Sequence, residues 1–537
     1  MATALLIVPH FWDPVCVPLG VSSLKAYAEA HGHTVRLLDV NGEPAIFGLQ
    51  HQYFQEVLRQ FPRWRNWNVQ RNGTEVLALH QIAFLSARSS PRYREIIAEI
   101  LNVREDSLGQ VVEALDVERF DQIFTRLYSA VGQLVSCKLA ETRPDVVGCS
   151  IFNSTWAGTL FVTNLAKRLL PHARTVVGGP GPLMGITSEG AEVQRFYDAH
   201  GNIDYFVVGE GESPFLNILE NAALPHGILC AREPGRRGLD FNSLPTPDYG
   251  ELPVERYLQL SVASSRGCPF ECSFCAETVF WNGYRKARTN QTYLRMNDLA
   301  ERYRRHSFYV CDSLSNAVIG PLTEEIQRNG KPFNLDCYLR ADKSCVDARK
   351  AAEWRAGGLY RARLGMESAS QRILDEMVKM TTPDLMSRSL HALSNSGIMT
   401  STLWIICYPG ETESEFQQTL DFIRAHRDQI YQADAWVFQY HQQGLSKSNL
   451  LNSLYGSRER FSPEVNSLLH VTPFVVERDV SAAERFDRLE RFVLAMRELE
   501  IPNPYSLFDW VGAERRWREL GRDAGWNVEQ SMLALNS

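Results

Sequence analysis

Two series of short apolar runs, each run followed by a helix-like stretch, constrain the fold of this 537-residue chain most strongly. The first series opens with the apolar run 3–8, continues with a helical stretch from Val21 to His31, and reaches a second apolar run at 34–38. Continuous apolar runs of this length are typical of parallel strands that are covered on both faces. The alternation therefore predicts an α/β protein built on parallel sheets.

The first series continues with strand candidates at 145–151, 175–177 and 203–208, so we expect a doubly wound parallel sheet of five strands within residues 1–223. A gap of about 100 residues separates the second strand from the third, and such a gap is too long for a bare loop. We predict a helical insertion at about 45–141. Its last part carries apolar residues at three- and four-residue spacing, namely Phe120, Ile123, Phe124, Leu127, Val131 and Leu134.

The second half of the chain repeats the alternation after a change of character. Residues 224–258 are rich in Pro and Gly and predict a linker. Residues 259–445 then hold six βα units, which predicts a partial (βα)6 barrel, because eight units need about 250 residues. Residues 446–537 lack a strand pattern and predict a mostly helical C-terminal region. The six strand candidates are 259–265, 307–311, 334–339, 362–366, 402–407 and 435–440.

Charge and hydropathy exclude several classes of partner. The formal net charge is -7, which argues against general binding of nucleic acid. No apolar run approaches the roughly 18 residues that a bilayer-spanning helix needs. The first 14 residues resemble a buried strand more than a signal peptide. We therefore expect a cytoplasmic protein with neither nucleic acid nor membrane as partner, in which the scattered cysteines are buried thiols.

Three cysteines are not scattered. Cys268, Cys272 and Cys275 follow a predicted strand with the spacing C-x3-C-x2-C, and no fourth Cys or His lies nearby. Structural zinc normally takes four ligands in paired C-x2-C units. Three thiolates on one loop instead fit a [4Fe–4S] cluster with one iron open to a ligand. A zinc site, chance cysteines, and Glu277 as a fourth ligand are the alternatives.

The spacing C-x3-C-x-aromatic-C after the first strand of a barrel resembles the radical S-adenosylmethionine (SAM) superfamily. The resemblance implies that Cys268, Cys272 and Cys275 hold the cluster and that Phe274 packs near the adenine of SAM. It also implies that the open iron binds SAM and that one electron cleaves it to a 5′-deoxyadenosyl radical, which abstracts a hydrogen atom. An electron donor such as flavodoxin or ferredoxin is the implied partner.

Polar residues end other strands of the predicted barrel, at the edge where barrel sites lie. Glu367 and Ser368 end the fourth strand, and the resemblance implies that they contact SAM. Arg340 ends the third strand, where it could face a carboxylate. Tyr408 ends the fifth strand, and we expect Glu367 and Tyr408 to be catalytic. The alternative for each position is a polar residue of the barrel rim.

The first sheet, placed directly before a radical barrel, resembles the cobalamin-binding domain of the class B radical SAM enzymes. We therefore expect cobalamin as a third cofactor, with the loop around Ser150 and Asn153 lining the corrin. Two further loops resemble those of that group at the carboxyl ends of the fourth and fifth strands. They are Gly178-Gly179-Pro180 and Gly209-Glu210-Gly211.

One departure concerns the lower face of the cobalamin. The D-x-H-x-x-G motif, whose His ligates cobalt in many cobalamin proteins, is missing after the first strand. His10 is the imidazole of that loop, and its position fits a loop or capping role better. We expect cobalamin with its own base displaced and without a protein His on cobalt.

Together these features predict a cobalamin-dependent radical SAM methyltransferase that acts on an inert carbon or phosphorus centre of a specialised metabolite or peptide. Radical rearrangement or cyclisation on the same cofactors is one alternative, and a non-catalytic redox protein is another. The C-terminal residues Trp510, Trp517 and Trp526 form either a buried aromatic stripe or a lid over the substrate.

Overall fold

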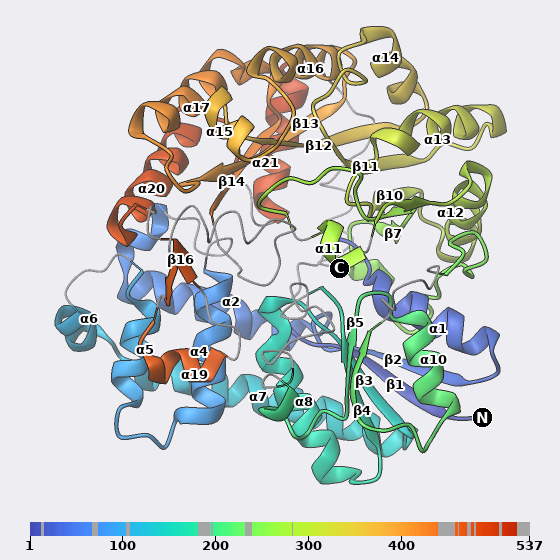
Figure 1. Ribbon diagram of the computed structural model, residues 1–537, viewed down its shortest axis with the longest axis vertical. Helices are drawn as coiled ribbons and strands as arrows, with labels where there is room; N and C mark the ends of the chain where they lie inside the picture. Colours follow the sequence, from blue (N-terminus) through green and yellow to red (C-terminus); the bar gives the residue numbers. More distant parts are fainter. Residues whose placement is uncertain are drawn as a thin grey trace.

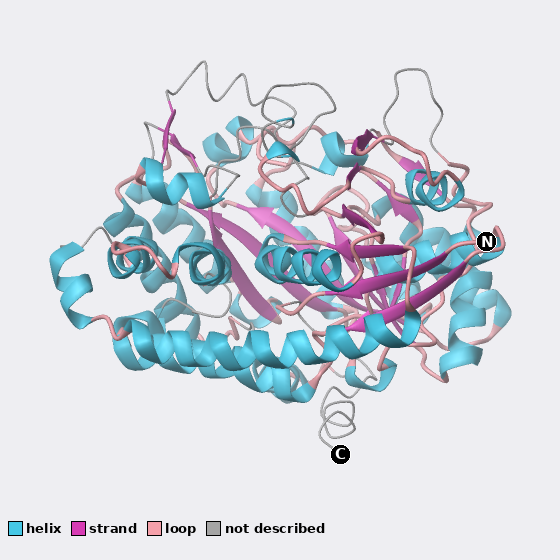
Figure 2. Cartoon of the chain, turned by 90° about the horizontal axis from the view of Figure 1, so that it is seen from below, coloured by secondary structure: helices cyan, strands magenta, loops and turns pink. Residues whose placement is uncertain are grey.

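Two six-stranded sheets organise the molecule, one in the lower half of Figure 1 and one in the upper half. Figure 2 shows the strands of both sheets at the centre, with helices around them. The computed structural model describes residues 1–11, 15–66, 73–103, 108–180, 194, 197–230, 239–275, 277–281, 283–438, 457–459, 461–469, 474–476, 480–503 and 507–522.

The first sheet is parallel throughout and has the strand order β2-β1-β3-β4-β5-β6. This is a doubly wound arrangement, with its switch point between β1 and β3. Helix α1 (Leu19–Ala30) packs against α10 (Glu212–Glu220), whereas α8 (Trp156–Leu169) packs against the insertion. The strands are β1 Thr3–Val8, β2 Thr34–Asp39, β3 Val146–Ser150, β4 Arg174–Gly178, β5 Tyr205–Val208 and β6 Gly227–Cys230.

Strand β6 corrects the sequence prediction. It lies inside the segment 224–258, which the Pro and Gly content marked as a linker, and it extends the sheet from five strands to six. Its half-buried residues Gly227–Cys230 form too short a run to stand out from the turn-forming residues around it. Pairing with β5 satisfies its backbone groups, and that long-range contact decides the strand.

The insertion between β2 and β3 is helical, as predicted. Its longest helix, α7, packs against both α2 and α8, so the insertion rests on one side of the first sheet. Figure 1 shows it on the left, in blue and cyan. Its elements are α2 Pro44–Gln60, η1 Pro62–Asn66, α4 Thr74–Ala87, α5 Tyr93–Leu101, α6 Leu108–Ala114 and α7 Val117–Thr142.

The second sheet is also parallel and has the order β14-β13-β12-β11-β10-β7, which is the partial barrel expected. Strand β12 begins at Leu359, earlier than the sequence predicted. The prediction missed this start because Arg361 and Arg363 interrupt the apolar pattern of the strand, although both residues are buried. Asp336 on β11 accepts two hydrogen bonds from Arg363, at 2.7 and 2.8 Å. The strands are β7 Leu260–Val262, β10 Ser307–Val310, β11 Asn334–Leu339, β12 Leu359–Glu367, β13 Met399–Ile406 and β14 Gln432–Val437.

Helices follow the barrel strands in order and cover the outside of the sheet (Figure 1). Most begin with a side-chain cap. Thr412, for example, accepts from the backbone N–H of Glu415, whose carboxylate accepts from the N–H of Thr412 in return. The helices are α12 Thr289–Tyr303, α13 Asn316–Asn329, α14 Ala348–Ala356, α15 Gln371–Glu376, α16 Pro383–Asn395 and α17 Glu413–Ala425.

The C-terminal region joins the insertion to the barrel. Helix α20 (Ala482–Glu498) packs on α17, β13 and β14, while α19 (Pro463–Leu469) packs on α4. An antiparallel pair, β15 (Ser457–Glu459) and β16 (Phe474–Val476), corrects the prediction that this region lacks strands.

The last described helix, α21 (Leu507–Glu519), contains two of the Trp residues for which the sequence left a buried aromatic stripe and a lid as alternatives. Trp517 is fully buried and packs edge-on against Tyr431 beneath the barrel, so this Trp is a core residue and not a lid. Trp526 and the side chain of Trp510 lie outside the described residues. None of the helices that the structure describes combines the length and apolarity needed to cross a bilayer.

Candidate functional site

The cysteine loop begins at the end of β7, where buried hydrogen bonds fix the chain. The carboxylate of Asp312 accepts from the backbone N–H groups of Ser264 and Ser265, at 2.7 and 2.9 Å, and from the Ser265 hydroxyl at 2.8 Å. Gly267 follows with φ +80°, and a Cβ there would collide with the carbonyl of Gly283. This turn therefore requires glycine, and it directs the chain into Cys268.

The three cysteines of the loop share one site. Cys272 is buried, and Cys268 and Cys275 are half-buried. Burial, together with the neighbouring charges of Glu277, Cys272 and Cys268, raises the pKa of Cys275 to about 12. In the described part of the chain, no group of three or more His, Cys, Asp or Glu side chains is arranged so that it could hold a single metal ion. A cluster differs from such a site because its thiolates bind separate iron atoms, so the zinc alternative gains no support.

Glu277, the alternative fourth ligand, lies on the short helix α11 (Glu277–Trp281). Its Oε2 atom accepts from the indole N–H of Trp281 at 2.9 Å and from the hydroxyl of Ser313 at 2.5 Å. These contacts anchor the carboxylate in the cavity wall, which disfavours a role as a cluster ligand.

Tyr408, expected to be catalytic, lies behind the cysteine loop. Its hydroxyl is 3.0 Å from Ser273 Oγ, and the backbone N–H of Ser273 donates to the carbonyl of Met377 at 3.0 Å. The ring packs against Phe438, and Phe274 borders the same apolar cluster. These contacts favour a positioning role for Tyr408, while the expected packing of Phe274 on adenine stays a prediction.

Glu367 and Lys379 form a buried ion pair beside the loop. Lys379 Nζ lies 2.7 Å from Glu367 Oε1 and 5.7 Å from the centre of the Phe274 ring. Sequence reasoning singled out Glu367 but missed Lys379, because nothing in its local sequence distinguishes it from a surface lysine. Ser368 is fully buried and accepts from the N–H of Ser370 at 3.1 Å, so its expected contact with SAM stays a prediction.

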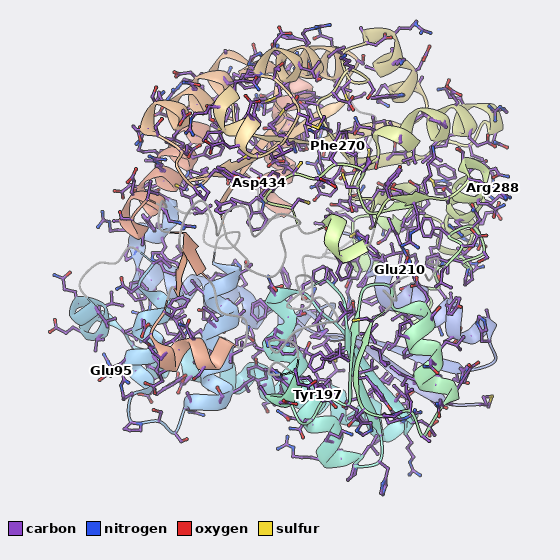
Figure 3. The ribbon with its side chains drawn as sticks, viewed as in Figure 1. Glu95, Tyr197, Glu210, Phe270, Arg288 and Asp434 are labelled. Atoms are coloured by element: carbon purple, nitrogen blue, oxygen red, sulfur yellow. The ribbon has the colours of Figure 1, made fainter. Side chains whose placement is uncertain are left out.

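Arg340 is the other cation at the cysteine loop. Its Nη1 atom lies 3.7 Å from Cys272 Sγ, and the guanidinium stacks on the Phe270 ring at 4.0 Å. Figure 3 marks Phe270 in the upper half of the molecule, on the barrel side. The structure thus places Arg340 next to a thiol of the cysteine loop, and the expected contact of Arg340 with a carboxylate stays a prediction.

A cavity of about 850 Å³ opens between the carboxyl edge of the first sheet and the barrel. From the barrel side it is lined by residues that include Arg266, Tyr309, Asp312, Tyr338, Arg363 and Trp436. From the first sheet it is lined by most of the predicted cofactor residues. They are Ser150, Gly178, Gly179, Pro180, Gly209, Glu210 and Gly211. The expected Asn153 is exposed and is not among the lining residues.

The cavity continues downward as a slot between the first sheet and α1. A Cβ at Gly148 would lie 2.5 Å from Leu6 Cδ2, and one at Gly211 would lie 3.1 Å from Leu24 Cδ2. All four residues line the cavity. Glycine at these positions therefore lets the two leucine side chains pack directly against the backbone of the cavity wall.

His10 takes no part in this cavity. It is buried, its Nε2 atom is 3.0 Å from Gln81 Oε1 in α4, and its ring packs against Gly158 of α8. Burial lowers the pKa of His10 to about 4, so the ring is neutral at physiological pH. No described residue that lines the cavity carries an imidazole, and the expected lack of a protein His on cobalt stays a prediction.

An ion-pair network joins the two cofactor loops across the cavity. Arg266, next to the cysteine loop, pairs with Glu210 at 2.7 Å and with Glu212, and Arg285 pairs with Glu210 at 2.9 Å. The Arg266 guanidinium also lies over the Phe241 ring at 5.0 Å. Figure 3 labels Glu210 where the first sheet meets the barrel. The sequence predicted Glu210 as a cofactor residue, and the structure adds this interdomain contact.

Residues 262–423 match the model of the radical SAM superfamily. The barrel is a radical SAM domain. Domains of this family use SAM and a [4Fe–4S] cluster, and the three thiols of the loop fit such a cluster. The match covers the strands and helices from β7 to α17, which include Cys268, Arg340 and Glu367.

Several relatives match a longer part of the chain than the radical SAM domain alone. The anaerobic magnesium-protoporphyrin IX monomethyl ester cyclase of Rubrivivax gelatinosus is 25% identical, over 73% of this chain and 76% of its own length. An uncharacterised methyltransferase of Pyrococcus horikoshii is 25% identical, over 59% of this chain and 71% of its own. The radical SAM methyltransferase TsrM of Kitasatospora setae, solved with cobalamin and a [4Fe–4S] cluster, has a TM-score of 0.60 at 14% identity, with both chains fully covered. The likeness to TsrM shows a shared fold.

Proposed function

We propose that this protein is a cobalamin-dependent radical SAM methyltransferase that transfers a methyl group to an inert carbon or phosphorus centre. The observation that carries the proposal is a cavity that lies between the glycine loops of the first sheet and the barrel, where Arg266 and Glu277, on either side of the cysteine loop, line it. Two reactive cofactors must face each other across the substrate for such a transfer, and this cavity offers that arrangement.

Each part of the chain has a role in this proposal. Residues 1–223, together with β6, form the cobalamin-binding domain, and 259–445 form the radical SAM domain. The described helices α19 and α20 of the C-terminal region connect the insertion to the barrel. When bound, the cluster, SAM and cobalamin supply the electron, the hydrogen-abstracting radical and the transferable methyl group.

The residues of the chain hold and orient these groups. Cys268, Cys272 and Cys275 would bind the cluster, and Tyr408 supports their loop through Ser273. Glu367 and Lys379 carry opposite charges next to Phe274, where an ammonium and a carboxylate of a ligand could each find a partner.

The lower face of the cobalamin would meet no described imidazole, because His10 is held by Gln81. We expect the electron paramagnetic resonance spectrum of the Co(II) form to lack superhyperfine splitting from a protein nitrogen. A three-line nitrogen pattern that disappears in His10→Ala would contradict this assignment.

The substrate is proposed to be small. The described cavity of about 850 Å³ would have to take cobalamin as well as the substrate, which favours a small molecule or a peptide side chain over a second macrocycle. Cyclisation is the second candidate, because the relative from Rubrivivax gelatinosus is named a cyclase.

Product analysis with both cofactors and a low-potential electron donor tests the proposal. For methylation of an unactivated carbon we expect a product heavier by one methyl group, with S-adenosylhomocysteine and 5′-deoxyadenosine in roughly equal amounts. Deoxyadenosine with an isomerised or cyclised product would favour the second candidate. Methylated product without deoxyadenosine would replace the radical route with polar methyl transfer.

A further inference from the structure

Contacts within the protein alone hold Arg340 in place at the end of β11. Its backbone N–H donates to Asn316 Oδ1 at 2.8 Å, and its carbonyl accepts from Asn316 Nδ2 at 3.0 Å. The side chain is only 4% exposed and stacks on Phe270. The guanidinium therefore has little freedom, and its position next to Cys272 is a built feature of the site.

The donors of this guanidinium are not all satisfied within the described chain. Nη1 reaches Cys272 Sγ at 3.7 Å, whereas Nη2 is buried without a hydrogen-bond partner among the described residues. No carboxylate in the described ion pairs neutralises Arg340, in contrast to Lys379, which pairs with Glu367. A buried, unpaired N–H of a charged group costs free energy, so a missing acceptor is expected at this point.

We propose that Arg340 is a positioning residue for the cluster, which donates charge-assisted hydrogen bonds to the Cys272 thiolate and to an adjacent cluster sulfur and thereby raises the reduction potential. One-electron reduction adds a negative charge to the cluster, and a fixed cation at hydrogen-bond distance stabilises the reduced form more than the oxidised form. Hydrogen bonds to sulfur are an established means of tuning such potentials. This inference rests on the cluster assignment and is independent of cobalamin.

The test is a redox titration of the anaerobically reconstituted full chain without SAM, followed by electron paramagnetic resonance. In Arg340→Gln we expect the ratio of reduced to oxidised cluster at a fixed potential to fall about tenfold, which corresponds to about 59 mV for one electron. Arg340→Lys, which keeps the charge but loses the forked donors, should fall between Gln and wild type.

Arg349→Gln is the matched control. Arg349 lies on α14, in the βα unit that follows Arg340, and its side chain is 75% exposed and paired with Glu353. The control makes the same change of charge without touching the cluster loop, so its potential should equal that of wild type.

Three outcomes decide against the proposal or its premise. An unchanged potential in Arg340→Gln, combined with weaker SAM binding, would make Arg340 a partner of the SAM carboxylate and overturn the inference. If Arg340→Gln retains no iron, Arg340→Lys carries the test, and a wild-type potential in that variant contradicts the inference. Wild-type protein that binds no cluster would instead refute the cluster assignment.

Discussion

At the scale of single residues, backbone strain gathers around the buried pair of Glu367 and Lys379. Glu367 has φ +66°, and the two neighbours of Lys379, Val378 and Met380, both have φ +53°. Left-handed conformations of residues other than glycine cost of order 1–3 kcal/mol each, and a β-branched residue such as Val378 tolerates them least. Other contacts must therefore offset the strain of the backbone that presents Lys379 to Glu367, and we propose on this ground that the pair is functional.

Removal of one partner of this pair tests its burial. Lys379→Met leaves the Glu367 carboxylate buried and unpaired, and we expect the apparent free energy of unfolding in urea to fall by about 3 kcal/mol. Glu367→Gln in the same chain should recover much of that loss, because the charge is then gone. Arg424→Met, which breaks an exposed pair with Asp421, should cost less than about 1 kcal/mol. Strictly additive effects of Lys379→Met and Glu367→Gln would refute the coupling.

At the scale of elements, the loop after β5 and the loop after β7 are held together by Arg266. Its side chain is 12% exposed and that of Glu212 is 4% exposed, so this contact is largely shielded from water. Burial acts to raise the pKa of Glu212, but the charge and the hydrogen bond of Arg266 outweigh burial and hold this pKa below its ordinary value. We therefore infer that the ion pair helps to set how the loop after β5 faces the cysteine loop.

Weakening this contact should loosen the spacing of the two cofactors. In Arg266→Gln, we expect pulsed electron paramagnetic resonance between Co(II) and the reduced cluster to give a broader distance distribution than in wild type. Arg285→Gln removes only a contact to Glu210 and should have a smaller effect. Equal distributions in all three proteins, with both cofactors bound, would show that other contacts set the spacing.

At the scale of the whole molecule, the insertion and the C-terminal region brace the two sheets. The hydroxyl of Ser462 donates to Glu99 of α5 at 2.9 Å, and Arg497 of α20 donates to Asn66 at 2.7 Å. Where the loop after β1 meets the insertion, burial lowers the pKa of His10 to about 4 and that of His80, in α4, to about 3. Near the barrel, burial raises the pKa of Glu411 to about 7.

These shifts predict opposite pH dependences in two parts of the molecule. A histidine that titrates near pH 6.5 when unfolded but near 4 when folded loses its stabilising contribution as the pH falls through that window. Glu411 has a raised folded pKa, so its contribution is lost as the pH rises from about 4.5 to about 7. Hydrogen exchange, corrected for intrinsic rates, should show weaker protection of α4 at pH 5 than at pH 7. His80→Gln should reduce that difference, and an equal difference in the variant would contradict the assignment to His80.

The sequence by itself determined the features whose signals are local. Apolar runs predicted most strands of both sheets, the cysteine spacing predicted the cluster loop, and the glycine loops after β4 and β5 predicted one wall of the cavity. Each depends on a pattern within a few residues, so no knowledge of distant contacts was needed. The absent motif near His10 likewise anticipated that this residue stays out of the cavity.

Only the tertiary structure decided the features that depend on long-range partners. Strand β6 forms because its backbone pairs with that of β5. Strand β12 can begin earlier than the sequence predicted because Asp336 neutralises Arg363 inside the barrel. Lys379 reaches the site through strained backbone, and Arg340 lies within hydrogen-bond distance of the Cys272 thiol. A sequence pattern predicts that a charged residue is exposed unless its partner is known. Such partners lie on other elements of the fold, so the local sequence carries no information about them.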